Sequence, residues 1–228
     1  MPTVLIADDQ ILVRAGLGAL LRMAPGLEVV GEACDGEDAV RQAAAARPDV
    51  VLMDIRMPGT DGIQATERIL ALPVARPSRV IALTTFDLDE YVYGALRAGA
   101  SGFLLKETPP ERLISAIHTV AAGDMLFAPS VTRRLVEAYA PATQPEPLGE
   151  PRGWSTVTNR EREVLQQVAR GHSNQQVAAT LCLSEATVKT HLNRAMVKLA
   201  LSSRAQVVVF CYENGLVVPG RADRPAGS

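Results

Sequence analysis

The sequence predicts two units of different fold class: an α/β unit over residues 1–124 and an all-α unit over residues 157–217. Three observations predict this division. Short apolar runs alternate with amphipathic stretches in the first 123 residues, a segment rich in Pro and Gly follows, and helix-capping signals recur after it. The length of 228 residues also suits two domains.

Five runs rich in Val, Ile and Leu are the candidate strands of the first unit. Such continuous apolar runs are typical of parallel strands, which are covered on both faces. Between them lie helical patterns, and their alternation with strands predicts a doubly wound, five-stranded parallel sheet. The predicted strands are Thr3–Ala7, Leu27–Gly31, Asp49–Met53, Arg79–Thr84 and Gly102–Leu105.

Residues 125–156 are predicted to form a linker. This stretch contains four prolines and two glycines between residues 141 and 153 and few apolar side chains, so it can bury little surface. The last stretch, residues 218–228, is predicted to be a disordered tail.

Capping signals divide the second unit into four helices. Thr158 with Glu161, and Ser173 with Gln176, have the spacing of capping boxes, and two further serines are candidate N-caps at positions 184 and 203. Glycines at positions 171 and 215 are placed where helices should end. Four helices in so short a stretch predict a compact all-α domain.

Charge is divided unevenly between the two units. Residues 1–130 hold 11 Lys and Arg against 17 Asp and Glu, a balance of −6, whereas residues 158–214 hold 7 against 4, a balance of +3. No apolar run approaches the roughly 20 residues of a membrane span, and no signal peptide is recognised. The three cysteines lack metal-ligand spacing. We therefore expect a reduced, cytoplasmic protein without a membrane partner.

Polar side chains follow four of the five predicted strands where these strands end. The carboxyl ends of parallel strands meet at one edge of a sheet, where ligands collect, so we expect these side chains to converge. Each of them alone is equally explained as a strand-end polar residue or a helix cap. The set is Asp8 and Asp9 after the first strand, Asp54 after the third, Thr84 at the end of the fourth and Lys106 after the fifth.

The chemistry of this set favours a magnesium-dependent phosphoacceptor site. Three neighbouring carboxylates repel one another, and Mg²⁺ suits a site of few carboxylates, water and a phosphoryl oxygen. A carboxylate can accept a phosphoryl group as an aspartyl phosphate. Lys106 and the Thr84 hydroxyl would then supply a positive charge and a hydrogen-bond donor for its oxygens.

The same residues, with Met57-Pro58-Gly59 and Asp61-Gly62 after Asp54, resemble the receiver domains of two-component response regulators. The resemblance implies a flavodoxin-like strand order and phosphorylation of Asp54 by a sensor histidine kinase. It implies Mg²⁺ bound by Asp9, Asp54 and the Arg56 backbone carbonyl, with Asp8 acting through water. It also implies that Thr84 and Lys106 serve the phosphoryl group, and that Thr84 and Phe103 form a switch. Many receivers follow the lysine with Pro, but here Glu107 follows Lys106.

A candidate DNA-reading helix starts near Glu185, after a short turn. Val188, Leu192, Ala195 and Leu199 share one face, which should pack on the core. The opposite face suits a major groove, because Asn reads adenine and Lys or Arg reads guanine or holds phosphate. The predicted DNA contacts are Thr187, Lys189, Thr190, Asn193, Arg194 and Lys198.

Several runs in this region resemble the LuxR-type helix-turn-helix domain of NarL/FixJ regulators. They are Thr158-Asn159-Arg160-Glu161-Arg162-Glu163-Val164-Leu165, Gly171, Ser173-Asn174 and Ser184-Glu185-Ala186-Thr187-Val188-Lys189-Thr190-His191. Family members commonly have Ile at the position of Val177 and Gly at that of Ala200. The resemblance implies binding to paired half-sites of double-stranded DNA as a homodimer, with a partly exposed apolar stripe on the last helix. Val207, Val208, Phe210 and Cys211 are the candidates for that stripe.

Two alternatives remain open. An enzyme with an aspartate nucleophile, such as a haloacid-dehalogenase-type phosphatase, would want Asp-x-Asp after its first strand, whereas Asp8 and Asp9 are adjacent and Asp54 lies on another strand. We therefore expect that the chain is not an enzyme. A regulator that binds DNA without phosphorylation, and uses its first domain to bind proteins, would share the whole C-terminal pattern.

Overall fold

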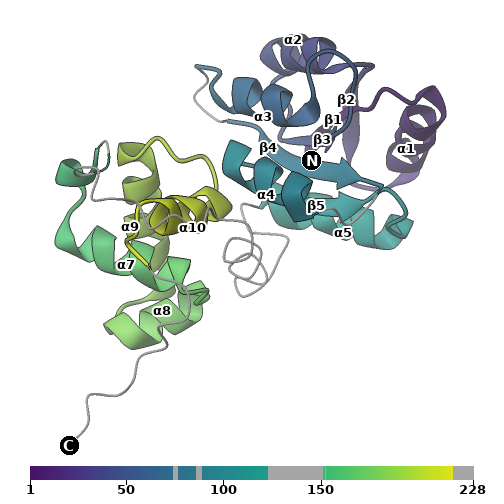
Figure 1. Ribbon diagram of the computed structural model, residues 1–228. Coiled ribbons are helices and arrows are strands. Elements are labelled where there is room, and N and C mark those ends of the chain that lie inside the picture. Colours follow the sequence, from purple (N-terminus) through teal and green to yellow (C-terminus); the bar gives the residue numbers. More distant parts are fainter. Residues whose placement is uncertain (74–76, 86–88, 123–150, 152, 218–228) are drawn as a thin grey trace, which may run out of the picture. The chain divides into compact units, whose positions relative to one another are not determined.

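The computed structural model describes residues 1–73, 77–85, 89–122, 151 and 153–217, which belong to two compact units (Figure 1). Most of the predicted linker and all of the predicted tail at 218–228 lie outside the described residues. Among the described residues, no helix has the length and apolar character needed to cross a bilayer.

The N-terminal unit is built on one sheet of five parallel strands. The strands are β1 (Thr3–Ala7), β2 (Glu28–Ala33), β3 (Val50–Asp54), β4 (Arg79–Thr84) and β5 (Gly102–Leu105). Their order, β2-β1-β3-β4-β5, is the predicted flavodoxin-like one. Strand β2 continues to Ala33, two residues beyond the predicted end. The register with β1 shifts between Val4 and Leu5, and pairing then continues to Ala7 opposite Ala33.

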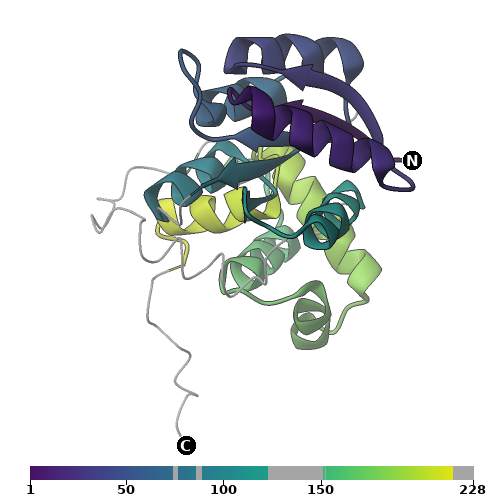
Figure 2. The ribbon, with the colours of Figure 1, turned by 90° about the vertical axis from the view of Figure 1, so that its right-hand side faces the viewer.

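Helices cover both faces of this sheet, as a doubly wound fold requires. Side chains on one face of β1, such as Val4 and Ile6, pack with α1 (Ile11–Met23) and α5 (Pro110–Ala121). Leu5 and Ala7 point to the other face and pack with α2 (Gly36–Ala46) and α3 (Gly62–Leu70). Helix α4 (Asp89–Ala98) covers β4 and β5 on that same face. Figure 2 shows α1 in front of the sheet.

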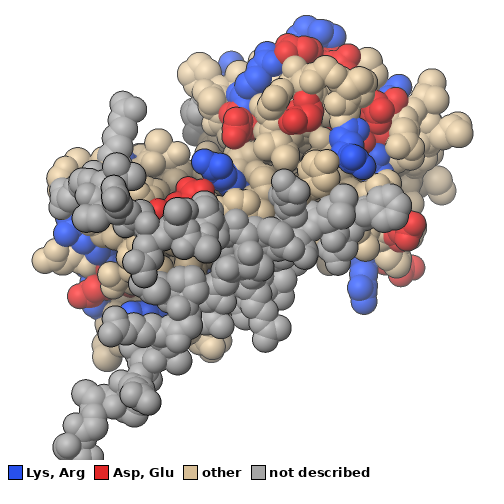
Figure 3. Space-filling view, in the orientation of Figure 1, with Lys and Arg blue, Asp and Glu red and all other residues tan. Residues whose placement is uncertain are grey.

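Charged side chains of both signs are interspersed over this unit in the view of Figure 3. Ion pairs account for part of the pattern. Arg22 lies 2.6 Å from Glu32, Arg41 lies 2.5 Å from Asp38, and Arg68 pairs with Glu37. Exposed pairs of this kind contribute little to stability, so the sheet and its two apolar layers hold the unit together.

The C-terminal unit is all helical, as predicted. Its elements are the short 3₁₀ helix η1 (Trp154–Thr156) and the helices α7 (Asn159–Ala169), α8 (Asn174–Leu181), α9 (Glu185–Lys198) and α10 (Arg204–Glu213). Both predicted capping boxes form, at Thr158 with Glu161 and at Ser173 with Gln176. The serines at positions 184 and 203 cap α9 and α10 through their hydroxyls.

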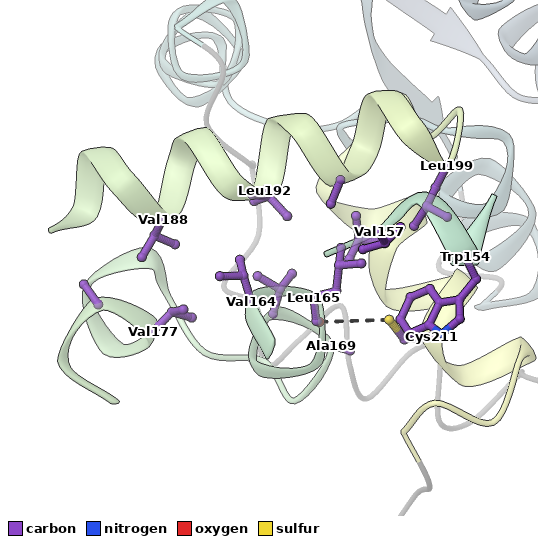
Figure 4. Close-up of a cluster of buried hydrophobic side chains, with 14 residues drawn as sticks. Trp154, Val157, Val164, Leu165, Ala169, Val177, Val188, Leu192, Leu199 and Cys211 are labelled. Carbon is purple, nitrogen blue, oxygen red and sulfur yellow. Dashed lines mark hydrogen bonds between the residues drawn. The ribbon is translucent and has the colours of Figure 1, made fainter. Parts of the chain in front are cut away.

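The core of this unit lies between α7, α8, α9 and α10 (Figure 4). Helix α9 turns Val188, Leu192, Ala195 and Leu199 into it, which confirms the face predicted from the sequence. Cys211 donates a weak hydrogen bond to the Leu165 carbonyl at 3.9 Å, and burial raises the pKa of this thiol to about 12. Cys211 is therefore a packing residue and not a reactive thiol.

Trp154 is part of this core, although the predicted linker extends to residue 156. The indole is 7% exposed, its ring centroid lies 6.2 Å from that of Phe210, and the Arg162 guanidinium stacks over it at 5.0 Å. Burying so large an aromatic side chain draws the preceding residues onto the helices. The helical unit therefore starts at least three residues earlier than position 157.

Three of the four residues predicted to form an apolar stripe on α10 pack on the core of the helical unit. Val207 and Cys211 are buried in this core, and Phe210 packs against it with part of its surface exposed. In this structure these side chains contribute to packing.

Candidate functional site

Three carboxylates meet at the carboxyl ends of the central strands. Asp8 and Asp9 follow β1, and Asp54 is the last residue of β3. Each offers an oxygen, and these oxygens lie within 4.8 Å of one another. Since β1 and β3 are hydrogen-bonded neighbours in the sheet, strand pairing alone brings these residues together, as the sequence predicted.

Lys106 joins two of these carboxylates. Its Nζ atom lies 2.7 Å from Asp54 Oδ2 and 2.7 Å from Asp8 Oδ2. The backbone N–H of Lys106 donates to the Thr84 carbonyl at 2.8 Å, which holds the end of β5 beside the end of β4. Thr84 is buried at this edge. All five polar residues predicted to converge thus lie at the same edge of the sheet.

Burial of this cluster controls its ionisation. Desolvation raises the pKa of Asp54, the Asp8 charge adds to this, and the Lys106 contacts oppose it. For Lys106, burial alone would lower the pKa, but the two carboxylates outweigh burial and raise it. Lys106 is therefore protonated at neutral pH and supplies the charge that favours ionised Asp54.

The carboxylate oxygens of this cluster could also bind a metal cation. The backbone N–H of Gln10 donates to Asp8 Oδ1 at 2.9 Å, and that of Arg56 donates to Asp54 Oδ1 at 3.2 Å. Asp8 Oδ2 is buried, and the Lys106 ammonium lies 2.7 Å from it. Asp9 is exposed. These are hard oxygen ligands with unused lone pairs, which fits Mg²⁺.

The loop between β3 and α3 is held by contacts that sequence reasoning missed. Thr60 donates its hydroxyl to Glu37 Oε1 at 2.8 Å, and Arg68 pairs with both oxygens of Glu37. On the other side of the loop, the Arg56 guanidinium lies 5.2 Å from the Tyr91 ring centroid of α4. These partners are 23 to 35 residues apart, so no local pattern could reveal them.

Phe103 lies in β5 opposite Ala82 of β4. It is half-buried and packs with the cluster that includes Ile55 and Tyr91. The side chain thus lies between the sheet and α4, on the layer that the loop after Asp54 also contacts.

The second candidate site is the exposed face of α9. Five of the six predicted DNA contacts are exposed residues of α9, namely Lys189, Thr190, Asn193, Arg194 and Lys198. Val197 is 81% exposed on the same face. An exposed valine beside polar side chains suits a groove that displays thymine methyl groups.

The Thr187 and Lys198 side chains also have partners within the unit. The Thr187 hydroxyl shares a 2.8 Å hydrogen bond with Ser184, the N-cap of α9. Lys198 Nζ lies 2.6 Å from Oε2 of Glu161, a buried residue of α7. Thr190 also uses its hydroxyl proton, donated to the Ala186 carbonyl at 2.9 Å, but its oxygen is still an acceptor.

Comparisons with known proteins identify the families of both domains. Residues 4–118 match the response regulator receiver domain family, and residues 155–211 match the luxR family of bacterial regulatory proteins. The chain is 43% identical to the transcriptional regulatory protein YxjL of Bacillus subtilis (strain 168), covering 94% of this chain and 96% of that protein. It is 33% identical to the nitrate/nitrite response regulator NarL of Escherichia coli (strain K12), covering 92% and 95%.

A solved structure of a receiver domain is also similar to this chain. The signal receiver domain of the putative response regulator NarL from Mycobacterium tuberculosis is 38% identical with a TM-score of 0.51. It covers 54% of this chain and 97% of that chain.

The parallel sheet with carboxylates at the ends of its strands and the helix-turn-helix unit are the features of a regulator that receives a signal and binds DNA. The chain belongs to the two-component response regulators that combine a receiver domain with a LuxR-type DNA-binding domain and control transcription.

Proposed function

We propose that Asp54 accepts a phosphoryl group from a sensor histidine kinase and that this modification controls DNA binding through α9. The observation that carries the proposal is that Asp54 lies 2.7 Å from Lys106 and offers an oxygen within 4.8 Å of oxygens of Asp8 and Asp9. In this role the chain is a regulator and not an enzyme acting on a separate substrate. Binding to DNA also implies that it works in the cytoplasm.

Asp54 provides the attacking carboxylate oxygen. Lys106 favours the ionised form of this carboxylate, which is only 3% exposed, and offers an N–H to the incoming phosphoryl oxygens. The Thr84 hydroxyl would donate to another of these oxygens. When bound, Mg²⁺ would offset the negative charge of the carboxylates and the phosphoryl group. Its proposed ligands are Asp9, Asp54 and the Arg56 backbone carbonyl, with Asp8 acting through water.

Phosphorylation replaces the single negative charge of the Asp54 carboxylate with a phosphoryl group that carries about 1.5 to 2 negative charges at neutral pH. We propose that Thr84 moves toward this group and that Phe103 moves inward with it. Phe103 packs in the cluster under α4, so its movement would change the surface formed by β4, α4 and β5. Such a change can only shift populations of states already accessible to the protein.

The output step is binding of α9 to the major groove. The exposed side chains of Lys189, Thr190, Asn193 and Arg194 would meet base edges and phosphates, and Thr187 would place the first turn of α9 near the backbone. We propose that two copies bind paired half-sites as a homodimer, since symmetric sites match symmetric proteins.

The proposal is tested by weighing the intact protein after incubation with Mg²⁺ and acetyl phosphate. One added phosphoryl group is expected on the wild type and none on Asp54→Asn. Binding to a duplex selected from a random library by the wild type should then strengthen with phosphorylation. If neither acetyl phosphate nor a promiscuous kinase modifies the wild type, the alternative regulator that binds DNA without phosphorylation is favoured.

A further inference from the structure

The C-terminal end of α9 is tied to the N-terminal end of α7 by an ion pair. Lys198 Nζ lies 2.6 Å from Glu161 Oε2. The side chain of Glu161 is 4% exposed, and that of Lys198 is 31% exposed. The pair is therefore closed off from solvent on the carboxylate side and partly open on the ammonium side.

Glu161 belongs to the capping box of α7. Its Oε2 accepts a hydrogen bond from the backbone N–H of Thr158 at 2.8 Å, and the same oxygen meets Lys198. Burial by itself would raise the pKa of Glu161, but the hydrogen bonds from Lys198 and Thr158 outweigh it and lower the pKa. The carboxylate is thus charged at neutral pH and depends on Lys198 as its counter-ion.

The backbone of Lys198 is held as well. Gly153 has a φ of 84°, and a Cβ atom added there would lie 2.8 Å from the Lys198 carbonyl oxygen. The turn before Trp154 therefore packs directly against the last turn of α9. Side chain and backbone of Lys198 are both fixed within the unit.

Helix geometry separates Lys198 from the residues expected to read bases. At about 100° per residue, Lys198 lies about 140° around α9 from Asn193 and about 180° from Lys189. Lys198 therefore lies on the flank of α9 that carries Arg194, about 40° away, and not on the side that carries Asn193. To reach a phosphate, Lys198 would also have to leave a buried carboxylate without its counter-charge, which is costly.

We propose that Lys198 is a positioning residue that sets the angle of α9 through Glu161, and that it does not contact phosphate. This proposal rests on DNA binding by α9. It replaces the sequence-based expectation that Lys198 binds DNA. The Lys198–Glu161 pair would hold α9 at the angle at which Asn193 and its exposed neighbours meet base edges.

The test measures binding of the full-length protein to two duplexes over a range of salt concentrations. One duplex is selected from a random library with the wild type, and the other is its scrambled version. The variants are Lys198→Met, Lys198→Arg, Glu161→Gln and the double variant Lys198→Met/Glu161→Gln. Gln keeps the capping box and removes only the charge. Arg194→Met, which removes an exposed cation of the same helix, is the matched control.

A positioning role predicts that only binding to the selected duplex weakens. Lys198→Met and Glu161→Gln should each weaken that complex roughly tenfold, the double variant should be little weaker still, and Lys198→Arg should restore most of the affinity. Affinity for the scrambled duplex and its salt dependence should stay at the wild-type level. Arg194→Met should weaken both complexes and reduce the salt slope by about 0.9, as expected when one phosphate is no longer neutralised.

Two results would overturn the proposal. One is a Lys198→Met variant that behaves like Arg194→Met on both duplexes, and the other is a variant that binds both duplexes like the wild type. If the wild type selects no duplex, the proposed DNA binding fails instead. Thermal unfolding without DNA then tests the Lys198–Glu161 pair. If the double variant loses as much stability as the two single variants together, the two residues are not coupled.

Discussion

The α-carbon of Gly62 packs directly against the backbone carbonyl of Asp54. A Cβ atom added to Gly62 would lie 1.9 Å from the Asp54 carbonyl oxygen. The Gly62 N–H donates to the carbonyl of Ile55 at 2.9 Å, which closes the loop after β3. Helix α3 can begin this close to the phosphoacceptor strand because its first residue has no side chain.

Gly62→Ala should therefore destabilise the receiver domain and disturb Asp54. The added methyl group meets backbone atoms that cannot move aside, so we expect a loss of about 3 kcal/mol in the free energy of unfolding. Phosphorylation of Asp54 by acetyl phosphate should also slow. Urea unfolding followed by far-ultraviolet circular dichroism measures the first effect, and intact mass against time measures the second.

Gly16→Ala is the matched control for this prediction. Gly16 lies inside α1, and a Cβ atom there would meet nothing within 4 Å. Alanine favours a helix over glycine, so this variant should gain up to about 1 kcal/mol and keep its phosphorylation rate. Equal effects of the two substitutions would contradict the steric explanation for Gly62.

The sequence marks Gly62 as part of a motif, but it does not show why glycine is required at this position. The run Asp61-Gly62 stands out as part of the receiver-like motif, and strand ends place Asp8 and Asp54 together through the period and order of the strands alone. The clash with the Asp54 carbonyl depends on where α3 starts in space. No residue pattern near Gly62 encodes that distance.

Lys106→Met should make the stability of the receiver domain strongly dependent on Mg²⁺. Lys106 lies 2.7 Å from an oxygen of both Asp8 and Asp54 and offsets their repulsion. Removing one partner of a buried pair costs about 3 kcal/mol, which we expect in metal-free buffer. A divalent cation that binds the same carboxylates should recover much of this loss.

Urea unfolding of Lys106→Met with Mg²⁺ and with EDTA measures this recovery. Asp54→Asn in the Lys106→Met background is the control, because it removes one of the repelling charges and should reduce the Mg²⁺ effect. A loss of stability that is the same with and without Mg²⁺ would argue against a shared cation and lysine site.

Glu37 should titrate far below an ordinary glutamate. The hydrogen bond from Arg68 contributes most, Thr60 contributes further, and together they lower the pKa of Glu37 from 4.5 to about 2. The folded-state value is depressed, so the stabilising contribution is present above pH 4.5 and is lost as the pH falls through about 2. Arg68→Met should return the pKa of Glu37 toward 4.5. Carboxyl carbon chemical shifts followed by NMR measure it, and an unchanged pKa would show that Arg68 is not the cause.

Ala200→Gly should stabilise the helical unit. Ala200 follows α9 with a φ of 53°, a left-handed conformation that costs a non-glycine residue roughly 1–2 kcal/mol. Glycine is more flexible in the unfolded chain, so we expect a net gain of about 0.5–1 kcal/mol. Thermal unfolding followed by Trp154 fluorescence reports on this unit, because Trp154 is buried in its core.

The control is Ala179→Gly, at an exposed position inside α8, which should lower the free energy of unfolding by about 1 kcal/mol.

Capping residues in the sequence predicted where the helices of the C-terminal unit begin, but not which distant residues contact each other. Caps at Thr158 and Ser184 fix where helices begin, and both were readable from three or four neighbouring residues. Lys198 was assigned to DNA because it lies off the apolar face of its helix. Its partner Glu161 lies 37 residues earlier, and Trp154 meets Phe210 across 56 residues, so only the packed unit reveals either contact.

Asn193→Ala tests the base-reading face of α9 directly. Asn193 is exposed on the side of α9 opposite to the core, and its amide can pair with adenine through two hydrogen bonds. The substitution should weaken binding to the selected duplex by roughly 1–3 kcal/mol and leave binding to a scrambled duplex unchanged.

The matched control is Asn159→Ala, the same change at an exposed position of α7, which should bind both duplexes like the wild type. Fluorescence anisotropy with labelled duplexes measures all four affinities. Unchanged affinity of Asn193→Ala for the selected duplex would remove Asn193 from the DNA-reading residues, because deleting an amide that reads a base must weaken the complex.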